Sequence, residues 1–264
     1  MTPPTGGSTT PGDTRRRIGL IVPSSNVTME IEVPKMLHAA AGDGFSFHSS
    51  RMRMRKVSAE ELAGMNEQAA RCVDEVADAR CDIIAYACLV AVMVQGPGAH
   101  REVQARLEAL LEARGDHVPV VSSAGALVDV LNDLGARRIA MVTPYVPALT
   151  DSVVTYLAAE GIETSSVRSL SVADNYEVGC IPGDRVVDAV AELDITGIDA
   201  LVLSACVQMP SLDIIDVVQQ RLGLPVVTAA SATSAAILRA LGASTTGIPG
   251  GIGGQLIAAQ HIDT

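Results

Sequence analysis

The segment "DIIAYACLVAVM" (residues 82–93) is an apolar run with a single thiol, Cys88, near its middle. A continuous apolar run of this kind is typical of a strand in a parallel sheet that helices cover on both faces. A cysteine in such a strand commonly packs as a small buried hydrophobe. The segment therefore predicts an α/β fold, and it leaves open whether Cys88 is a core residue or a reactive one.

A second segment repeats the first. "DALVLSACVQMP" (residues 199–210) resembles residues 82–93 and places Cys206 where the first segment has Cys88. Two further pairs of segments match in the same order: "RRRIGLIVPSSN" (15–26) with "ARRIAMVTPY" (136–145), and "PVVSSAGALVDVLNDLGA" (119–136) with "PVVTAASATSAAILRALGA" (225–243). The spacing is kept, at 62 residues from position 26 to 88 and 61 residues from position 145 to 206. A duplicated α/β unit explains these matches.

The duplication changes the interpretation of two cysteines. In parallel α/β sheets, ligands bind at the carboxyl ends of the strands. Two facing copies of the unit would therefore bring Cys88 and Cys206 to opposite sides of one cleft. Cys72 and Cys81 lie on or beside a helix and are expected in the core, and Cys180 has no counterpart in the other half.

Between these segments the pattern of apolar residues predicts alternating strands and helices, which is typical of βαβ units. We expect a helix beginning near Asn26 or Thr28, a strand within residues 45–57, and one helix that starts at the capping residue Ser58 and continues to about residue 80. Further helices are expected at about 100–114, 148–160, 183–193, 211–222 and 231–241. "GIPGGIGGQ" (247–255) has no adequate helix after it and is expected to be a flexible tail rather than a phosphate-binding loop.

Composition excludes several classes of partner. The 264-residue chain has a formal net charge of -11, which argues against binding to nucleic acid or to an anionic membrane. Its five cysteines include no CxxC pair, so neither a metal site nor a disulfide framework is expected, and free thiols favour a cytoplasmic location. Residues 1–14 lack the apolar core of a signal peptide and are expected to be a disordered tail.

Several motifs together resemble the maleate cis-trans isomerases of the aspartate/glutamate racemase superfamily, from about residue 15 to about 243: "GLIVPSSN", "HSSRMRM", "ARCDIIAYACLVAVM", "GPGAHRE", "SSAGALVDVLNDLG" and "LVLSACVQMPSL". Amino-acid racemases usually have Asn and Thr directly after each catalytic cysteine, whereas Leu89-Val90 and Val207-Gln208 follow here. Arylmalonate decarboxylases keep only the second-half cysteine. The retained pair of thiols favours an isomerase or a racemase over a decarboxylase.

The resemblance implies two Rossmann-like parallel-sheet lobes related by pseudo-twofold symmetry. Residues 15–120 and 225–264 would form the N-terminal lobe, and residues 121–224 the C-terminal lobe. It also implies a homodimer that converts maleate, a small dicarboxylate, to fumarate without a cofactor.

Carried over position by position, the resemblance makes Cys88 the nucleophile and Cys206 the acid/base, and it gives Asn26, Tyr145 and Asn175 the role of holding the substrate carboxylates. The segments that carry the two cysteines, residues 82–93 and 199–210, contain no Lys or Arg. The Arg51, Arg53 and Arg55 stripe is expected to be a solvated strand face or to lie at the cleft or dimer interface. Further donors are therefore expected among backbone N–H groups at helix starts, near Ser24, Leu89, Val90 and Val207.

Four alternatives remain open from the residues themselves. Asn26 could serve only as a helix cap, and Asn175, which follows an aspartate, could serve only in a turn. The chain as a whole could be a cofactor-independent racemase or decarboxylase of the same superfamily. It could also be a binding protein for small acids that lacks catalytic activity.

Overall fold

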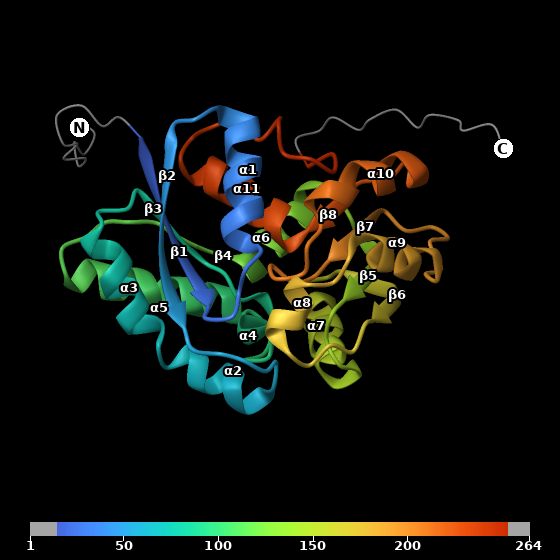
Figure 1. The fold of residues 1–264 in the computed structure, drawn as a ribbon, viewed down its shortest axis with the longest axis horizontal. Coiled ribbons are helices and arrows are strands. Elements are labelled where there is room, and N and C mark those ends of the chain that lie inside the picture. The colour runs from blue at the N-terminus through green and yellow to red at the C-terminus, as the bar shows by residue number, and fades with distance from the viewer. Residues whose placement is uncertain (1–14, 253–264) are drawn as a thin grey trace.

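The computed structural model describes residues 15–252, which form two four-stranded parallel sheets lying side by side (Figure 1). The first sheet has the strand order β2-β1-β3-β4, and the second has the order β6-β5-β7-β8. Their bounds are Arg16–Pro23 (β1), Phe45–Met52 (β2), Ile83–Tyr86 (β3), Val120–Ser122 (β4), Arg138–Thr143 (β5), Glu163–Ser169 (β6), Ala200–Ser204 (β7) and Val226–Thr228 (β8). The identical strand orders confirm the duplicated α/β unit.

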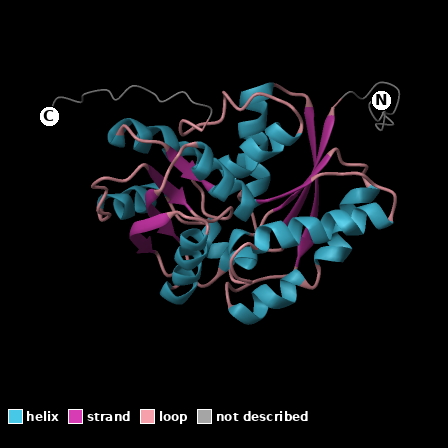
Figure 2. Cartoon of the chain, turned by 180° about the vertical axis from the view of Figure 1, so that it is seen from behind, coloured by secondary structure: helices cyan, strands magenta, loops and turns pink. Residues whose placement is uncertain are grey.

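Helices lie around both sheets, as the view from behind in Figure 2 shows. They are Met29–Ala41 (α1), Ala59–Asn66 (α2), Ala69–Asp78 (α3), Leu89–Met93 (α4), Ala99–Ala113 (α5), Ser123–Asp133 (α6), Pro147–Ala159 (α7), Asn175–Gly179 (α8), Gly183–Ala191 (α9), Leu212–Leu222 (α10) and Ala229–Ala240 (α11). Every residue of the central strands β3 and β7 is buried. This burial accounts for their uniformly apolar sequences, because helices cover both faces of each sheet.

The boundary between the lobes differs from the expected one by a strand. The strand β8 pairs with β7 and so belongs to the second sheet, whereas residues 225–264 were all expected in the first lobe. The chain returns to the first lobe with α11, which packs against α1 and α6. The matching strand β4 pairs with β3 in the first sheet, and so it crosses the boundary expected after residue 120. In each copy of the repeated unit, the last strand pairs with the central strand of the same copy: β4 with β3, and β8 with β7.

Two elements predicted as continuous are interrupted. The apolar run expected as one strand forms β3 and then the short helix α4. Cys88 lies between them and is the N-cap residue of α4. Buried strands and buried helices can both be apolar throughout, so periodicity does not separate them. The helix expected from Ser58 to about residue 80 is divided into α2 and α3, although the Ser58 hydroxyl does accept the predicted capping hydrogen bond from Glu61 N–H (3.3 Å).

Residues 247–252, which follow α11 and were expected to begin a flexible tail, pack against the second sheet instead. Ile248 and Ile252 are buried, and the backbone N–H of Val226 donates a hydrogen bond to the carbonyl oxygen of Gly250 (3.0 Å). Gly250 has φ +86°, and a Cβ there would lie 1.9 Å from the Val226 carbonyl oxygen. Only glycine fits this close approach. Residues 253–255 and the expected tail at 1–14 lie outside the described residues.

None of the helices in residues 15–252 combines the length and the apolar character that crossing a membrane requires.

Candidate functional site

Cys88 lies at the carboxyl end of β3, in the extended residue that precedes α4. Its side chain is almost completely buried. Burial raises the pKa of the thiol to about 12, a hydrogen bond from the backbone N–H of Ala91 opposes that rise, and the nearby Cys206 thiol adds to it. The break between strand and helix therefore places the N–H of Ala91, in the first turn of α4, near the sulfur.

Cys206 occupies the matching place after β7. Its backbone is fixed in a tight turn, because its carbonyl oxygen accepts hydrogen bonds from the Ser204 hydroxyl (2.8 Å) and from Met209 N–H (3.3 Å). Burial raises the pKa of the Cys206 thiol, while the nearby Tyr145 hydroxyl and the N–H groups of Gln208 and Met209 lower it. The two thiols thus have similar surroundings, as the duplication predicts.

Tyr145 connects the two cysteines. Its hydroxyl donates a hydrogen bond to the carbonyl oxygen of Ala205 (3.0 Å) and contacts the Cys206 thiol. The pKa of the Tyr145 phenol is raised chiefly by burial and further by both Cys206 and Cys88. Cys88, Cys206 and Tyr145 therefore come together in one buried group, although they are separated by up to 118 positions in the chain.

Asn26 lies two residues before Thr28, the N-cap residue of α1, where its side chain binds the start of the helix and still has a free donor. Its Oδ1 accepts hydrogen bonds from the N–H groups of Thr28 (3.0 Å) and Met29 (2.9 Å). Its Nδ2 is buried and has no hydrogen-bond partner in the described structure. A buried amide donor without a partner is unfavourable by roughly 1–3 kcal/mol unless something binds it. Capping therefore explains the contacts of Oδ1, whereas Nδ2 is available to a ligand.

Asn175 begins the short helix α8 rather than lying in a turn, and Asp174 is its cap. Its backbone N–H donates to the carbonyl oxygen of Arg55 (3.0 Å), and its Nδ2 donates to the Ser25 hydroxyl (2.9 Å). The side chain is buried. A residue from the second half of the chain is thereby attached to the loop that carries Asn26.

The expected role of Ser24 differs from what the structure shows. Its N–H already donates to the carbonyl oxygen of Met52 (2.6 Å), and its hydroxyl contacts both the N–H and the carbonyl oxygen of Met54. These bonds extend the pairing of β1 with β2 and leave Ser24 exposed with no donor for a ligand. Leu89, Val90 and Val207, which follow the two cysteines, are buried, and the role of their N–H groups stays a prediction.

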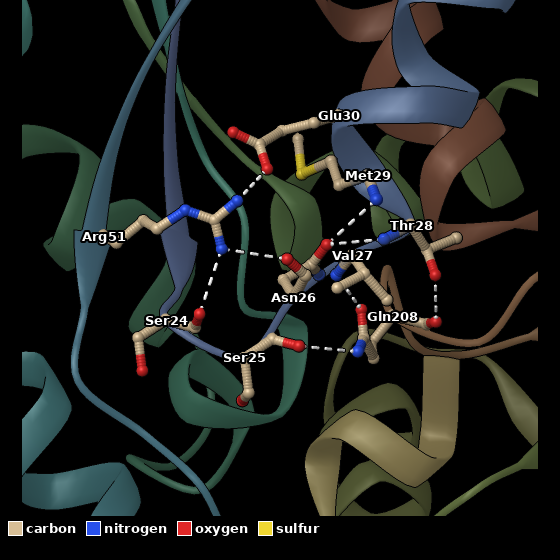
Figure 3. A network of polar contacts seen from close by, with 9 residues as sticks. All are labelled: Ser24, Ser25, Asn26, Val27, Thr28, Met29, Glu30, Arg51 and Gln208. Carbon is tan, nitrogen blue, oxygen red and sulfur yellow. Dashed lines mark hydrogen bonds and ion pairs between the residues drawn. The ribbon is translucent and has the colours of Figure 1, made fainter. Parts of the chain in front are cut away.

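Two further side chains contact the loop that carries Asn26: Gln208, which sequence reasoning did not single out, and Arg51, which was expected on a solvated strand face or at the cleft or dimer interface. The carboxamide of Gln208 bonds to the backbone on either side of Asn26, as Figure 3 shows. The Arg51 guanidinium donates to the carbonyl oxygens of Ser24 (3.0 Å) and Asn26 (2.9 Å) and pairs with Glu30. Gln208 could have been noticed as a polar residue in an otherwise apolar motif, but the Arg51 contacts depend on tertiary structure.

The remaining described residues offer no rival centre of chemistry. Within residues 15–252, no group of three or more His, Cys, Asp or Glu side chains is arranged to hold a metal ion. A surface depression of about 170 Å³ lies beside β6 and α9, away from both thiols. Its Arg168 forms an ion pair with Glu192 (2.9 Å), and its Arg185 donates to a backbone carbonyl.

Comparisons with known proteins agree with this arrangement. Residues 18–251 match the family model described as arylmalonate decarboxylase. The chain is 54% identical over 226 residues to a maleate isomerase of Nocardia farcinica, which covers 86% of this chain and 90% of that protein.

Two solved structures are also similar. One is the Nocardia farcinica maleate cis-trans isomerase, in a cysteine-to-serine variant with a covalently bound succinylcysteine intermediate. It has a TM-score of 0.89 and 51% identity, and the match covers 91% of this chain and 99% of that one. The other is a cysteine-to-alanine variant of the Pseudomonas putida maleate isomerase with maleate, with a TM-score of 0.88, 45% identity, and 90% and 98% of the two chains covered. The chain therefore belongs to the family that contains the arylmalonate decarboxylases and the maleate cis-trans isomerases, within the aspartate/glutamate racemase superfamily.

Proposed function

We propose that this protein catalyses the cis-trans isomerisation of maleate to fumarate, with Cys88 as the nucleophile, Cys206 as the acid/base and no cofactor. The observation that carries the proposal is the pair of buried thiols at matching strand ends, close enough that each influences the same tyrosine. The membership of the family and the likeness to maleate isomerases over about nine-tenths of the chain support it.

The reaction requires that the double bond lose its double-bond character for a time. The Cys88 S–H first gives up its proton to solvent and takes one back after the reaction. The thiolate adds to one alkene carbon, C2, forming a C–S bond and moving the π electrons to C3, beside a carboxylate. The C2–C3 bond is then single and can rotate. Return of the electrons reforms the double bond, breaks the C–S bond and releases fumarate with Cys88 regenerated. Atoms and electrons balance without an oxidant or a reductant.

Cys206 acts at C3 in this scheme. In one version its S–H gives a proton to C3 and takes a proton back before elimination. In the other it stabilises an enolate-like intermediate without transferring the proton. Running the reaction in D2O separates the two, because only proton transfer from an exchangeable thiol can leave deuterium at C3 of the product.

The substrate is a dianion and the chain carries a net charge of -11, so local donors must outweigh the overall charge. The unpartnered Nδ2 of Asn26 is suited to one carboxylate oxygen. Asn175 keeps one Nδ2 hydrogen beyond its bond to the Ser25 hydroxyl, and it is a further donor together with the N–H groups of Leu89, Val90 and Val207. Tyr145 would bind the substrate by exchanging its bond to the Ala205 carbonyl oxygen for one to a carboxylate. Hydrogen bonds from such groups, aimed where charge develops and shielded from water, stabilise an anionic intermediate.

One experiment tests the activity. The protein is incubated with maleate, without added cofactor, and fumarate is followed by proton NMR. A parallel sample contains an arylmalonate, since the matched family model bears the decarboxylase description. Fumarate formation supports the proposal, decarboxylation of the arylmalonate alone would favour the alternative enzyme, and well-folded protein that acts on neither would favour a binding protein.

We also propose that the protein works as a homodimer in the cytoplasm. Five free cysteines lie in the described residues, and the mechanism needs two of them reduced, which a reducing compartment ensures. The dimer is proposed by likeness to the family. Light scattering on the protein as it elutes from a size-exclusion column should give twice the mass of one chain.

A further inference from the structure

The side chain of Gln208 is buried two residues after Cys206, and both ends of its carboxamide are occupied. Its Oε1 accepts a hydrogen bond from the N–H of Val27 (2.9 Å). Its Nε2 donates to the carbonyl oxygens of Ser25 (2.9 Å) and Asn175 (2.8 Å). All three partners are backbone groups, so the amide satisfies backbone donors and acceptors as a neighbouring strand would in a sheet.

Two of these partners flank Asn26. Because the amide binds the residue before and the residue after it, the backbone of Asn26 is held against the turn that carries Cys206 (Figure 3). The hydroxyl of Thr28 adds a third bond by donating to the carbonyl oxygen of Gln208 (2.7 Å). The loop that presents the free Nδ2 of Asn26 therefore depends on a side chain from the other half of the chain.

The third partner is the carbonyl oxygen of Asn175, whose own Nδ2 binds the Ser25 hydroxyl. Gln208, Ser25 and Asn175 thus form a closed set of hydrogen bonds. Gly179, one turn after Asn175, borders the amide, and a Cβ there would lie 2.7 Å from Gln208 Nε2 and 2.7 Å from Val27 Cγ2. The amide is therefore closely packed on this side.

We propose that Gln208 is a positioning residue of the isomerase reaction, whose carboxamide fixes the two carboxylate-binding asparagines, Asn26 and Asn175, relative to Cys206. This inference rests on the proposed function. The duplication supports this inference. Val90 lies two positions after Cys88, so an amide at this position occurs only after Cys206. A glutamate could not donate to two carbonyl oxygens, and an apolar residue would leave three backbone groups without a partner.

A double-mutant cycle tests the proposal. Gln208→Met keeps the length of the side chain and removes the amide. It is compared with wild type, Asn26→Ala and the Gln208→Met/Asn26→Ala double variant by kcat and KM for maleate. Gln104→Met is the matched control, because it removes an amide that donates to the carbonyl oxygen of Val120 (3.0 Å) away from the thiols.

If Gln208 acts through Asn26, Gln208→Met lowers kcat/KM by about tenfold or more, chiefly by raising KM, and most of that loss disappears when Asn26 is already alanine. The control keeps kcat/KM within about twofold of wild type. Independent effects that multiply in the double variant would overturn the proposal, and so would an unchanged KM in Gln208→Met.

A second variant guards against misfolding. If Gln208→Met does not fold, as judged by circular dichroism, Gln208→Glu keeps the side-chain volume and the Val27 contact, and the same cycle is run with it. Wild-type protein that forms no fumarate would overturn the proposed function and this inference together. If the wild-type protein is active but the effects of the Gln208 and Asn26 variants multiply in the double variant, only the role of Gln208 is overturned.

Discussion

The carboxylate of Glu32 on α1 accepts hydrogen bonds from the backbone N–H (2.7 Å) and the hydroxyl (3.1 Å) of Ser211, which precedes α10 in the other half of the chain. It also accepts one from the N–H of Leu212 (2.8 Å). A buried carboxylate thus caps a helix from a distance of about 180 positions in the sequence. With Gln208, it holds the chain after Cys206 against α1.

Replacement of Glu32 by alanine should lower the free energy of unfolding by roughly 2–5 kcal/mol, since buried donors lose their acceptor. Glu32→Gln keeps an oxygen for both N–H groups and an amide for the Ser211 hydroxyl, so it should cost much less. Urea unfolding measures both changes. Glu163→Gln, which removes an exposed ion pair with Arg138, is the control and should change stability by less than about 1 kcal/mol.

The same residue predicts a pH dependence. Burial raises the pKa of Glu32 above its ordinary value of 4.5, against the lowering effect of the hydrogen bonds from Leu212 and Ser211. The folded state therefore holds this proton more tightly than the unfolded state. The resulting stability is fully present below pH 4.5 and is lost as the pH rises through the folded-state pKa. The stability of Glu32→Gln relative to wild type should rise over that window in urea unfolding, and a constant difference would contradict the prediction.

Asn26→Asp separates the capping role from the binding role. Aspartate caps a helix as well as asparagine does, so the unfolding free energy should stay within about 2 kcal/mol of wild type. The new oxygen replaces the free Nδ2 donor and repels a dianion, so kcat/KM for maleate should fall by about 100-fold or more. Full activity in a stable Asn26→Asp variant would show that this amide does not bind the substrate.

Serine variants of the two cysteines assign their roles. Cys206→Ser keeps the nucleophile and should accumulate an adduct of about 116 Da, the mass of the added acid, on Cys88. Cys88→Ser should form no adduct and no fumarate. Intact-protein mass spectrometry after incubation with maleate measures both, and an adduct on Cys206 in the Cys88→Ser variant would reverse the assignment.

Without substrate, Cys88 should be a thiol at neutral pH, because burial raises its pKa to about 12. Its alkylation by iodoacetamide should therefore be slow at pH 7 and rise with pH without levelling off below about pH 10, as the thiolate fraction grows tenfold per unit. Peptide mapping of the labelled protein gives the rate for each cysteine. The exposed Cys180 serves as an internal reference for reagent quality. A plateau near neutral pH would mean that the free protein already holds a thiolate.

Much of the fold could be predicted from the sequence because its signals are local or repeated. The apolar runs of β3 and β7 and the matched spacing of the halves predicted two parallel sheets and the pairing of Cys88 with Cys206. The errors lie where a buried segment is apolar in either conformation, as at α4, or where partner choice depends on the sheet edge, as for β8. Ser24 was misassigned because the continued pairing of β1 with β2 occupies its N–H.

By itself, the sequence determined the α/β class, the duplicated unit and the two thiols at matching positions, since these follow from periodicity and from comparison of the chain with itself. Only the tertiary structure decided that Gln208 holds Asn26, that Glu32 caps α10 and that the Asn26 amide keeps a free donor. The hydrogen bond from Val27 to Gln208 spans 181 positions. Such a bond depends on how the two lobes pack against each other, and no local pattern of residues encodes that packing.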